Sequence, residues 1–234
     1  MIRIRQIAPS ALILMLMVMV SAPAEAQTTG GRFEISGSAG IIGGTDLGTA
    51  TATLSGSGVP TGSPITLFDT ETKIEGGPRY EARMAWRFSR ALQVEGGVAI
   101  NRSHLTTRIT NDFEQAPDTE ASESFTEYAI EAGVLFHLNK LTFAGGRARP
   151  FVAGGAGYLR QVHEDQTVIE TGQSAYAGGG VTFTLRQAPR KAFIEGFGLR
   201  ADVRANFRSG GFEHSDDDGA TFAPSVTGGV FIRF

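Results

Sequence analysis

This sequence of 234 residues contains no cysteine. Disulfide bonds therefore contribute nothing to its stability, and in an oxidising compartment other interactions must hold the fold together. Strands that pair in a closed ring satisfy their backbone hydrogen bonds internally, so such a fold needs no covalent link.

Long apolar runs and an excess of positive charge are also missing. After the first 26 residues there is no stretch of about 20 apolar residues, which argues against transmembrane helices in the body of the chain. Without Arg3, Arg5 and Glu25, that body carries 19 basic and 23 acidic residues. This acidic balance argues against nucleic acid as a partner.

Glycine, by contrast, is abundant, at 31 residues. The glycines follow no three-residue repeat, which excludes a collagen-like helix. They are spread through segments in which apolar and polar residues alternate, where glycine is typical of crowded or bent positions in a sheet. The mean hydropathy of −0.05 fits a membrane barrel, because only one face of each strand meets lipid.

The N-terminus has the pattern of an export signal. Arg3 and Arg5 precede an apolar run at residues 11–20, and Ala24 and Ala26 fit a small-x-small cleavage site. The alternative is an N-terminal membrane anchor, but the run is short and a cleavage site follows it. We predict a signal peptide over residues 1–26, cleaved to leave a β-barrel domain over residues 27–234. With no cysteine at the cleavage site, it is not a lipoprotein signal.

The last nine residues, 226–234, read V-T-G-G-V-F-I-R-F, with apolar or small side chains at every second position. A two-residue period places these residues on one face of a strand. Here the sequence resembles the small outer-membrane β-barrel proteins of Gram-negative bacteria, the OmpA/OmpX-like family. The resemblance implies that the outer-membrane assembly machinery recognises the final strand, with Val230, Ile232 and Phe234 as the signal.

The same alternation recurs through the chain. The clearest case is residues 79–88, where Met84 and Trp86 fall on one face and Arg83 and Arg87 on the other. Eight segments show it: residues 33–41, 79–88, 92–101, 126–138, 150–161, 175–185, 199–207 and 226–234. Long loops at residues 43–77, 103–124, 162–173 and 208–222 alternate with short turns. The sequence therefore predicts an all-β fold, an antiparallel eight-stranded up-and-down transmembrane β-barrel.

Two details of this prediction stay open. Residues 150–161 are small enough to fit either register, so their two faces are unassigned. Glu195 falls on the lipid-facing parity, which predicts either a position at the membrane interface or a β-bulge. The rival architecture is a soluble exported barrel of lipocalin type, in which the apolar face would point inward. Charged residues between apolar girdles favour the membrane barrel.

The inward positions of the predicted strands carry charges of both signs. An isolated buried charge is very costly, and eight strands enclose a space that side chains roughly fill, so these charges must pair. We predict a structural ion-pair network that plugs the lumen, with a narrow pore for ions or small solutes as the alternative. The predicted network comprises Glu34, Arg79, Glu81, Arg83, Arg87, Glu95, Glu127, Glu131, Arg200, Asp202 and Arg204.

Chemistry-bearing residues are few. Of the four histidines, His163 lies beside Glu164 and Asp165, and His214 beside Glu213. A catalytic triad needs residues that converge from separate rigid elements, whereas these are adjacent in sequence on loops. No cofactor or metal motif is present. The sequence predicts a non-enzymatic protein, and a lipid-modifying outer-membrane enzyme remains the alternative.

The predicted loops are acidic and the predicted turns are basic, which indicates solvated rims. The alternative is that acidic loops bind divalent cations that bridge to lipopolysaccharide phosphates. We therefore expect a monomer in the cell outer membrane, with outer-membrane lipid, lipopolysaccharide and the assembly machinery as partners. Its predicted role is structural or interactive: envelope integrity or adhesion through the extracellular loops.

Overall fold

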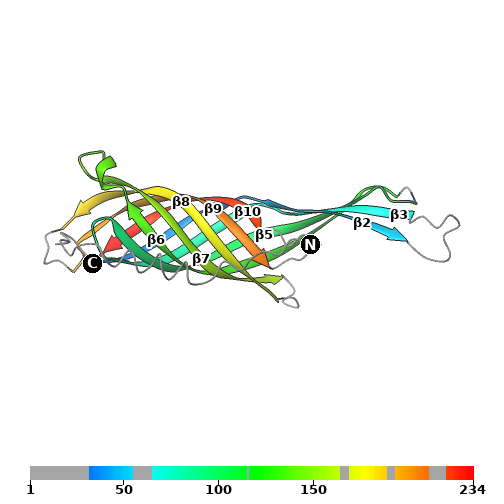
Figure 1. The fold of residues 1–234 in the computed structure, drawn as a ribbon, viewed down its shortest axis with the longest axis horizontal. Coiled ribbons are helices and arrows are strands. Elements are labelled where there is room, and N and C mark those ends of the chain that lie inside the picture. The colour runs from blue at the N-terminus through cyan, green and yellow to red at the C-terminus, as the bar shows by residue number, and fades with distance from the viewer. Residues whose placement is uncertain (1–31, 55–64, 115, 164–168, 189–192, 211–219) are drawn as a thin grey trace, which may run out of the picture.

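The computed structural model describes residues 32–54, 65–114, 116–163, 169–188, 193–210 and 220–234 (Figure 1). The predicted signal peptide lies outside these residues, and none of the helices among them is long and apolar enough to cross a membrane. The elements are β1 (Phe33–Ile42), β2 (Thr45–Leu54), β3 (Ile65–Ile74), β4 (Gly77–Arg87), β5 (Leu92–Thr110), β6 (Thr119–His137), the 3-10 helix η2 (Asn139–Leu141), β7 (Ala148–His163), β8 (Ile169–Gln187), β9 (Gly196–Gly210) and β10 (Thr221–Arg233).

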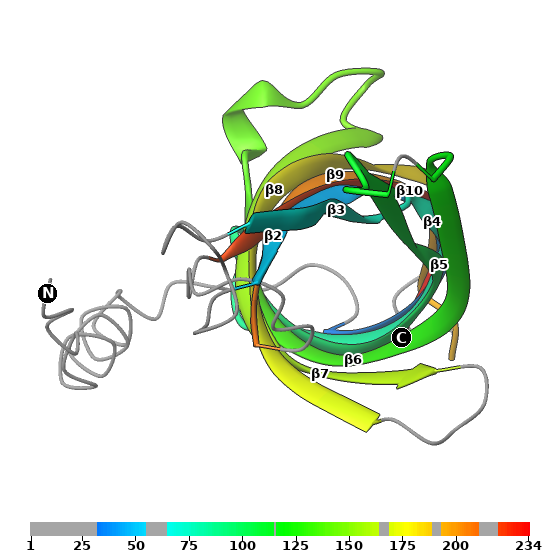
Figure 2. The same cartoon turned by 90° about the vertical axis from the view of Figure 1, so that its right-hand side faces the viewer.

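Eight of these strands close into a ring in which all neighbours are antiparallel. The order around the ring is β1, β4, β5, β6, β7, β8, β9, β10 and back to β1. Figure 2 looks onto one end of the barrel and shows the ring closed. The first and last strands meet with Gly37 opposite Val230. The predicted eight-stranded antiparallel barrel is thus confirmed.

The two faces of the barrel wall have opposite chemistry. Outward apolar side chains are exposed, with Met84 at 61% and Val98 at 52% of their full accessibility, whereas the inward Arg79 and Glu95 are almost completely buried. A soluble barrel of lipocalin type would bury its apolar face, so that alternative is wrong. The exposed apolar face is the one that lipid covers.

The height of the apolar face matches a membrane. On β5 the outward apolar positions run from Leu92 to Ile100, and Arg102 is the first charged outward position beyond them. Nine residues at about 3.4 Å each, tilted by about 40°, rise about 23 Å, close to the roughly 25 Å expected for a lipid-facing band.

The prediction that residues 43–77 form a loop was wrong. Apart from residues 55–64, which are not described, this segment forms the antiparallel hairpin β2–β3, and β3 also pairs with β5 from Asp69 to Ile74. The hairpin projects beyond the ring on the right of Figure 1. An apolar period of two marks a strand with one buried face, and a strand that meets water on both faces lacks that signal.

Three other predicted loops are also shorter than expected, because strands continue into them. β5 and β6 remain paired up to Ile109 and Thr119, β7 extends to His163, and β9 extends to Gly210. We call the end of the barrel that carries β2, β3 and these extensions the loop end. The opposite end, with the short connections, is the turn end.

The structure resolves both open details of the sequence interpretation. In β7, Phe151, Leu159 and Gln161 are buried inside the barrel, while Val152 and Tyr158 face outward.

Glu195 precedes β9, and its N–H donates to the Arg233 carbonyl at 2.8 Å. The only register shift in the β8–β9 pair lies nearby, between Thr184 and Arg186 of β8. The bulge is therefore on the neighbouring strand.

Candidate functional site

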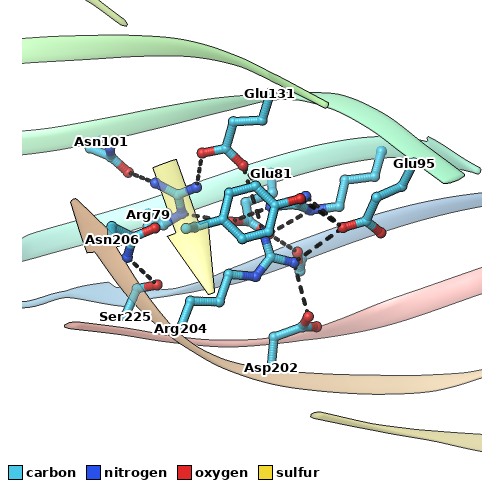
Figure 3. A network of polar contacts seen from close by, with 12 residues as sticks. Arg79, Glu81, Glu95, Asn101, Glu131, Asp202, Arg204, Asn206 and Ser225 are labelled. Atoms are coloured by element: carbon cyan, nitrogen blue, oxygen red, sulfur yellow. Dashed lines mark hydrogen bonds and ion pairs between the residues drawn. The ribbon is translucent and has the colours of Figure 1, made fainter. Parts of the chain in front are cut away.

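Charged side chains from strands far apart in the sequence fill the middle of the barrel (Figure 3). Four arginines and four carboxylates meet there with almost no solvent exposure, so the formal charges balance. Balance is what burial demands, because an unpaired charge would be poorly solvated. The arginines are Arg79, Arg83, Arg200 and Arg204, and the carboxylates are Glu81, Glu95, Glu131 and Asp202.

Arg83 on β4 shows how this central layer links strands. Its guanidinium donates to Glu81 at 3.0 Å, to Glu95 at 3.1 Å and to Glu131 at 3.0 Å. These acceptors lie on β4, β5 and β6. One side chain therefore joins three neighbouring strands from inside the lumen.

Glu95 on β5 extends the layer across the barrel. One carboxylate oxygen accepts from Arg83, and the other lies 2.9 Å from Nη1 of Arg200 on β9. β5 and β9 are on opposite sides of the ring, so this ion pair crosses the lumen. Arg200 also donates twice to Asp202, at 2.8 and 2.9 Å, and Arg204 donates to the same carboxylate at 2.9 Å.

Tyr176 on β8 fills the space beside these charges. Its hydroxyl donates to Glu95 at 3.4 Å, and the Arg204 guanidinium lies 4.7 Å from its ring centroid, a cation–π contact. The ring lies against two inward glycines. A Cβ at Gly133 would overlap the hydroxyl, and one at Gly155 would lie 2.7 Å from the ring. Glycine is therefore required at these two positions, because a larger residue would clash with Tyr176.

At the loop end of the lumen a smaller layer surrounds Glu127. Its carboxylate accepts from the amide of Gln161 at 3.1 Å and lies 3.2 Å from Nη2 of Arg208. Asn101 joins Glu127 to Arg79 of the central layer. The sequence pattern predicts a loop from Arg208 onward and therefore does not predict this ion pair, although Arg208 continues the inward parity of positions 200, 202, 204 and 206.

At the turn end, Glu34 holds two arginines. Arg233 Nη2 lies 2.8 Å and Arg87 Nη2 3.6 Å from the same carboxylate oxygen. Gln93 accepts from Arg87 at 3.3 Å and lies 3.2 Å from Nε2 of His137. The structure thus brings all the predicted lumen residues inside the barrel, in three layers.

The described residues hold no recognisable catalytic or metal set. His137 is buried near Phe151, and His104 is exposed on β5. No group of three His, Cys, Asp or Glu side chains in the described part of the chain could hold a metal ion. Glu164 and Asp165, and the acidic segment around His214, lie outside that part.

Beyond the barrel at the loop end, β2, β3 and the extended parts of β5 and β6 form a four-stranded sheet. We call it the loop-end sheet. Thr51 and Asn111 donate to the Asp69 carboxylate at 2.7 and 2.9 Å, which lowers the pKa of Asp69 below its usual range. Arg108 pairs with Asp118 at 2.8 Å. The sheet is therefore polar and tied together by short side-chain contacts.

The family model of the outer membrane protein beta-barrel domain matches residues 12–230. The chain belongs to this family. It is an outer-membrane β-barrel protein, in agreement with the location and architecture predicted from the alternating strands.

Solved barrels show a general likeness at low sequence identity. The Neisserial surface protein A is 13% identical, with a TM-score of 0.48, over 86% of this chain and 97% of its own. OprG of Pseudomonas aeruginosa is 10% identical, with a TM-score of 0.48, over 90% and 99%. Ail of Yersinia pestis is 15% identical, with a TM-score of 0.40, over 87% and 99%. No curated protein sequence matches the chain.

The residues predicted as an assembly signal lie at the seam of this outer-membrane barrel. Val230 and Ile232 face outward on β10. Phe234 exchanges backbone hydrogen bonds with Phe33, at 2.8 and 3.3 Å, and its ring lies 5.3 Å from that of Phe193. Phe234 therefore holds the two ends of the ring together at the turn end.

Proposed function

We propose that this outer-membrane protein is a closed, non-enzymatic barrel that acts at the cell surface through its loop-end sheet, in adhesion or in maintaining the envelope. The observation that carries the proposal is the filled lumen, which the Glu95–Arg200 ion pair crosses from wall to wall. The polar loop-end sheet is then the part of the molecule best placed to meet a partner.

Several further assignments belong to the same proposal. Residues 1–26 direct export and are removed after Ala26. The loop end faces the outside of the cell, and the turn end faces the periplasm. The assembly machinery reads Val230, Ile232 and Phe234, and the lumen charges serve as a structural plug.

Conductance across a planar bilayer tests the plug. The wild-type barrel is expected to give no steady single-channel current. A variant with Glu95, Tyr176 and Arg200 replaced by alanine removes the side chains that cross the lumen, and it is expected to conduct if it still closes into a heat-modifiable barrel. A steady current through the wild-type protein would contradict the plug and support the narrow pore.

Removal of the β2–β3 hairpin tests the surface role. Residues 45–74 can be deleted so that Gly43, Gly44, Glu75 and Gly76 remain as a turn between β1 and β4, because Ile42 and Gly77 are already paired. Cells with this variant are expected to adhere less well to a surface, or to resist detergent less well, than wild-type cells. Unchanged adhesion and unchanged detergent resistance, at equal amounts of assembled barrel, would refute a role for this part of the sheet.

A further inference from the structure

Two arginines interrupt the lipid-facing wall just beyond its apolar band at the loop end. Arg102 on β5 and Arg160 on β7 are both exposed and both have outward parity. Neither forms an ion pair with any residue of the described chain. Seven arginines that point into the lumen, by contrast, each have a carboxylate within 4 Å: Arg79, Arg83, Arg87, Arg200, Arg204, Arg208 and Arg233.

The two arginines flank a single strand, β6. Arg102 is opposite Thr126, and Arg160 is opposite Tyr128, the next outward position on β6. Strands lie about 4.8 Å apart, so the two guanidiniums start from backbones about 10 Å apart laterally and can converge over β6. The half-exposed Tyr128 lies between them. The two arginines therefore form a positively charged strip on the outer wall of the barrel.

The position of this strip in the membrane decides what can meet it. Tyr80, Tyr128 and Tyr158 are half exposed at the loop-end edge of the apolar band, where amphipathic rings sit at headgroup level. Arginines at that depth face the lipid headgroups rather than the hydrocarbon. The guanidinium is suited to phosphate, because its planar fork of donors matches two phosphate oxygens.

The charge of the surrounding loop end supports the same ligand. In the loop-end sheet, Asp69, Glu71, Asp118 and Glu120 carry negative charge, and the cations Lys73 and Arg108 are already paired with acidic partners. An anionic headgroup is repelled by such a surface and attracted to the two unpaired arginines below it.

We propose that Arg102 and Arg160 form a binding site on the outer wall of the barrel for the phosphates of a phosphorylated glycolipid in the loop-side leaflet. Tyr128 supplies a hydroxyl between them, and the apolar wall below receives the acyl chains. The site rests on the outward orientation of the loop end stated above, but not on any role of the loop-end sheet in binding a partner.

Lipid retention by the purified full-length protein tests the site. Native mass spectrometry in detergent can follow binding of bisphosphorylated lipid A, its dephosphorylated form and phosphatidylglycerol. The double variant Arg102→Gln, Arg160→Gln is expected to bind bisphosphorylated lipid A about tenfold or more weakly than wild type, since it loses two charge-assisted contacts. Wild type is expected to bind dephosphorylated lipid A as weakly as the double variant binds the bisphosphorylated form.

Arg108→Gln is the matched control, because Arg108 lies on the same strand and has the same parity but is paired with Asp118 beyond the apolar band. Heat-modifiability on gels checks that each variant is a closed barrel. The site would be overturned if the double variant bound bisphosphorylated lipid A as tightly as wild type does. It would also be overturned if Arg108→Gln lost as much binding as the double variant. If wild type retained phosphatidylglycerol as well as bisphosphorylated lipid A, the assignment of the site to a glycolipid would be overturned.

Discussion

At the scale of single residues, the lumen shows that inward charges are stabilised in sets rather than in pairs. Arg83 contacts three carboxylates, and Glu95 contacts arginines from both sides of the ring. Buried ion pairs contribute little net stability relative to apolar packing, but loss of one partner leaves an uncompensated charge. The large effect is therefore expected from breaking the network.

The first prediction concerns Arg83→Ala, which leaves Glu81, Glu95 and Glu131 with one cation fewer. We expect a loss of about 3–5 kcal/mol in the free energy of unfolding. Urea titration of the barrel in vesicles measures it. Arg108→Ala, at an exposed ion pair, is the control and should cost about 1 kcal/mol or less.

A second substitution separates lost pairing from lost packing. Glu81→Gln added to Arg83→Ala removes one of the stranded charges, so the double variant should lose less than the sum of the two single losses. Additive losses, or equal urea midpoints for Arg83→Ala and Arg108→Ala, would show that the lumen charges are not coupled as the contacts imply.

The second prediction concerns the lipid face. Met84 lies outward near the middle of the apolar band on β4, between Trp86 and Tyr80. Met84→Arg should cost about 2–4 kcal/mol in vesicles, whereas Ser209→Arg, outward at the loop-end boundary of β9, should cost about 1 kcal/mol or less. Equal costs at the two depths would be incompatible with a membrane-spanning wall.

At the scale of elements, β2 and β3 differ from the other strands in where they find partners. Among the described residues, β2 pairs only with β3, and β3 also pairs with β5 above the ring. The Thr45 hydroxyl donates to the Phe222 carbonyl at 2.7 Å, and the Gly43 N–H donates to the Pro224 carbonyl at 2.6 Å, so β10 supports the base of the hairpin. The hairpin is therefore an addition to a complete barrel.

The third prediction follows from this arrangement. Deletion of residues 45–74 should leave the urea midpoint of the barrel nearly unchanged, because the ring keeps all its neighbouring strand pairs. It should also make the extended part of β5 more accessible, since β3 no longer pairs with it. Urea titration in vesicles measures the first effect, and protease digestion measures the second. A deletion variant that fails to close would show that the hairpin is part of the barrel's folding unit.

At the scale of the whole molecule, closure of the ring depends on the pair of β1 and β10. These strands come from the two ends of the described chain, and Phe234 makes the last contacts of their seam. A barrel has no free edge only once this pair has formed. The barrel therefore cannot close until the final strand has paired with β1.

The fourth prediction tests Phe234 as part of an assembly signal. Deletion of Phe234 should lower the amount of folded protein in the outer membrane while export across the inner membrane continues, as fractionation and heat-modifiability would show. Phe222→Ala, at the loop end of the same strand, removes an exposed aromatic that contacts Phe207 and should leave assembly intact. Normal assembly without Phe234 would refute the signal.

The alternation of apolar and polar residues was enough to predict the number of barrel strands and the face on which their residues lie. Because the lipid-facing wall requires an apolar side chain at every second position, strands such as β4 alternate apolar and polar residues in the sequence. Arg79, Arg83 and Arg87 lie inside the barrel because they have the parity opposite to Met84 and Trp86.

Which charges meet, and where the sheet continues beyond the barrel, could not be predicted, because both depend on how the strands pair around the ring. Glu95 and Arg200 are about a hundred residues apart, and they touch because ring closure places β5 opposite β9. Phe151 could be placed inside only once the register of β7 was fixed. β2 and β3 carry no apolar period, so their own pattern does not reveal them as strands, and only the structure shows that β3 pairs with β5.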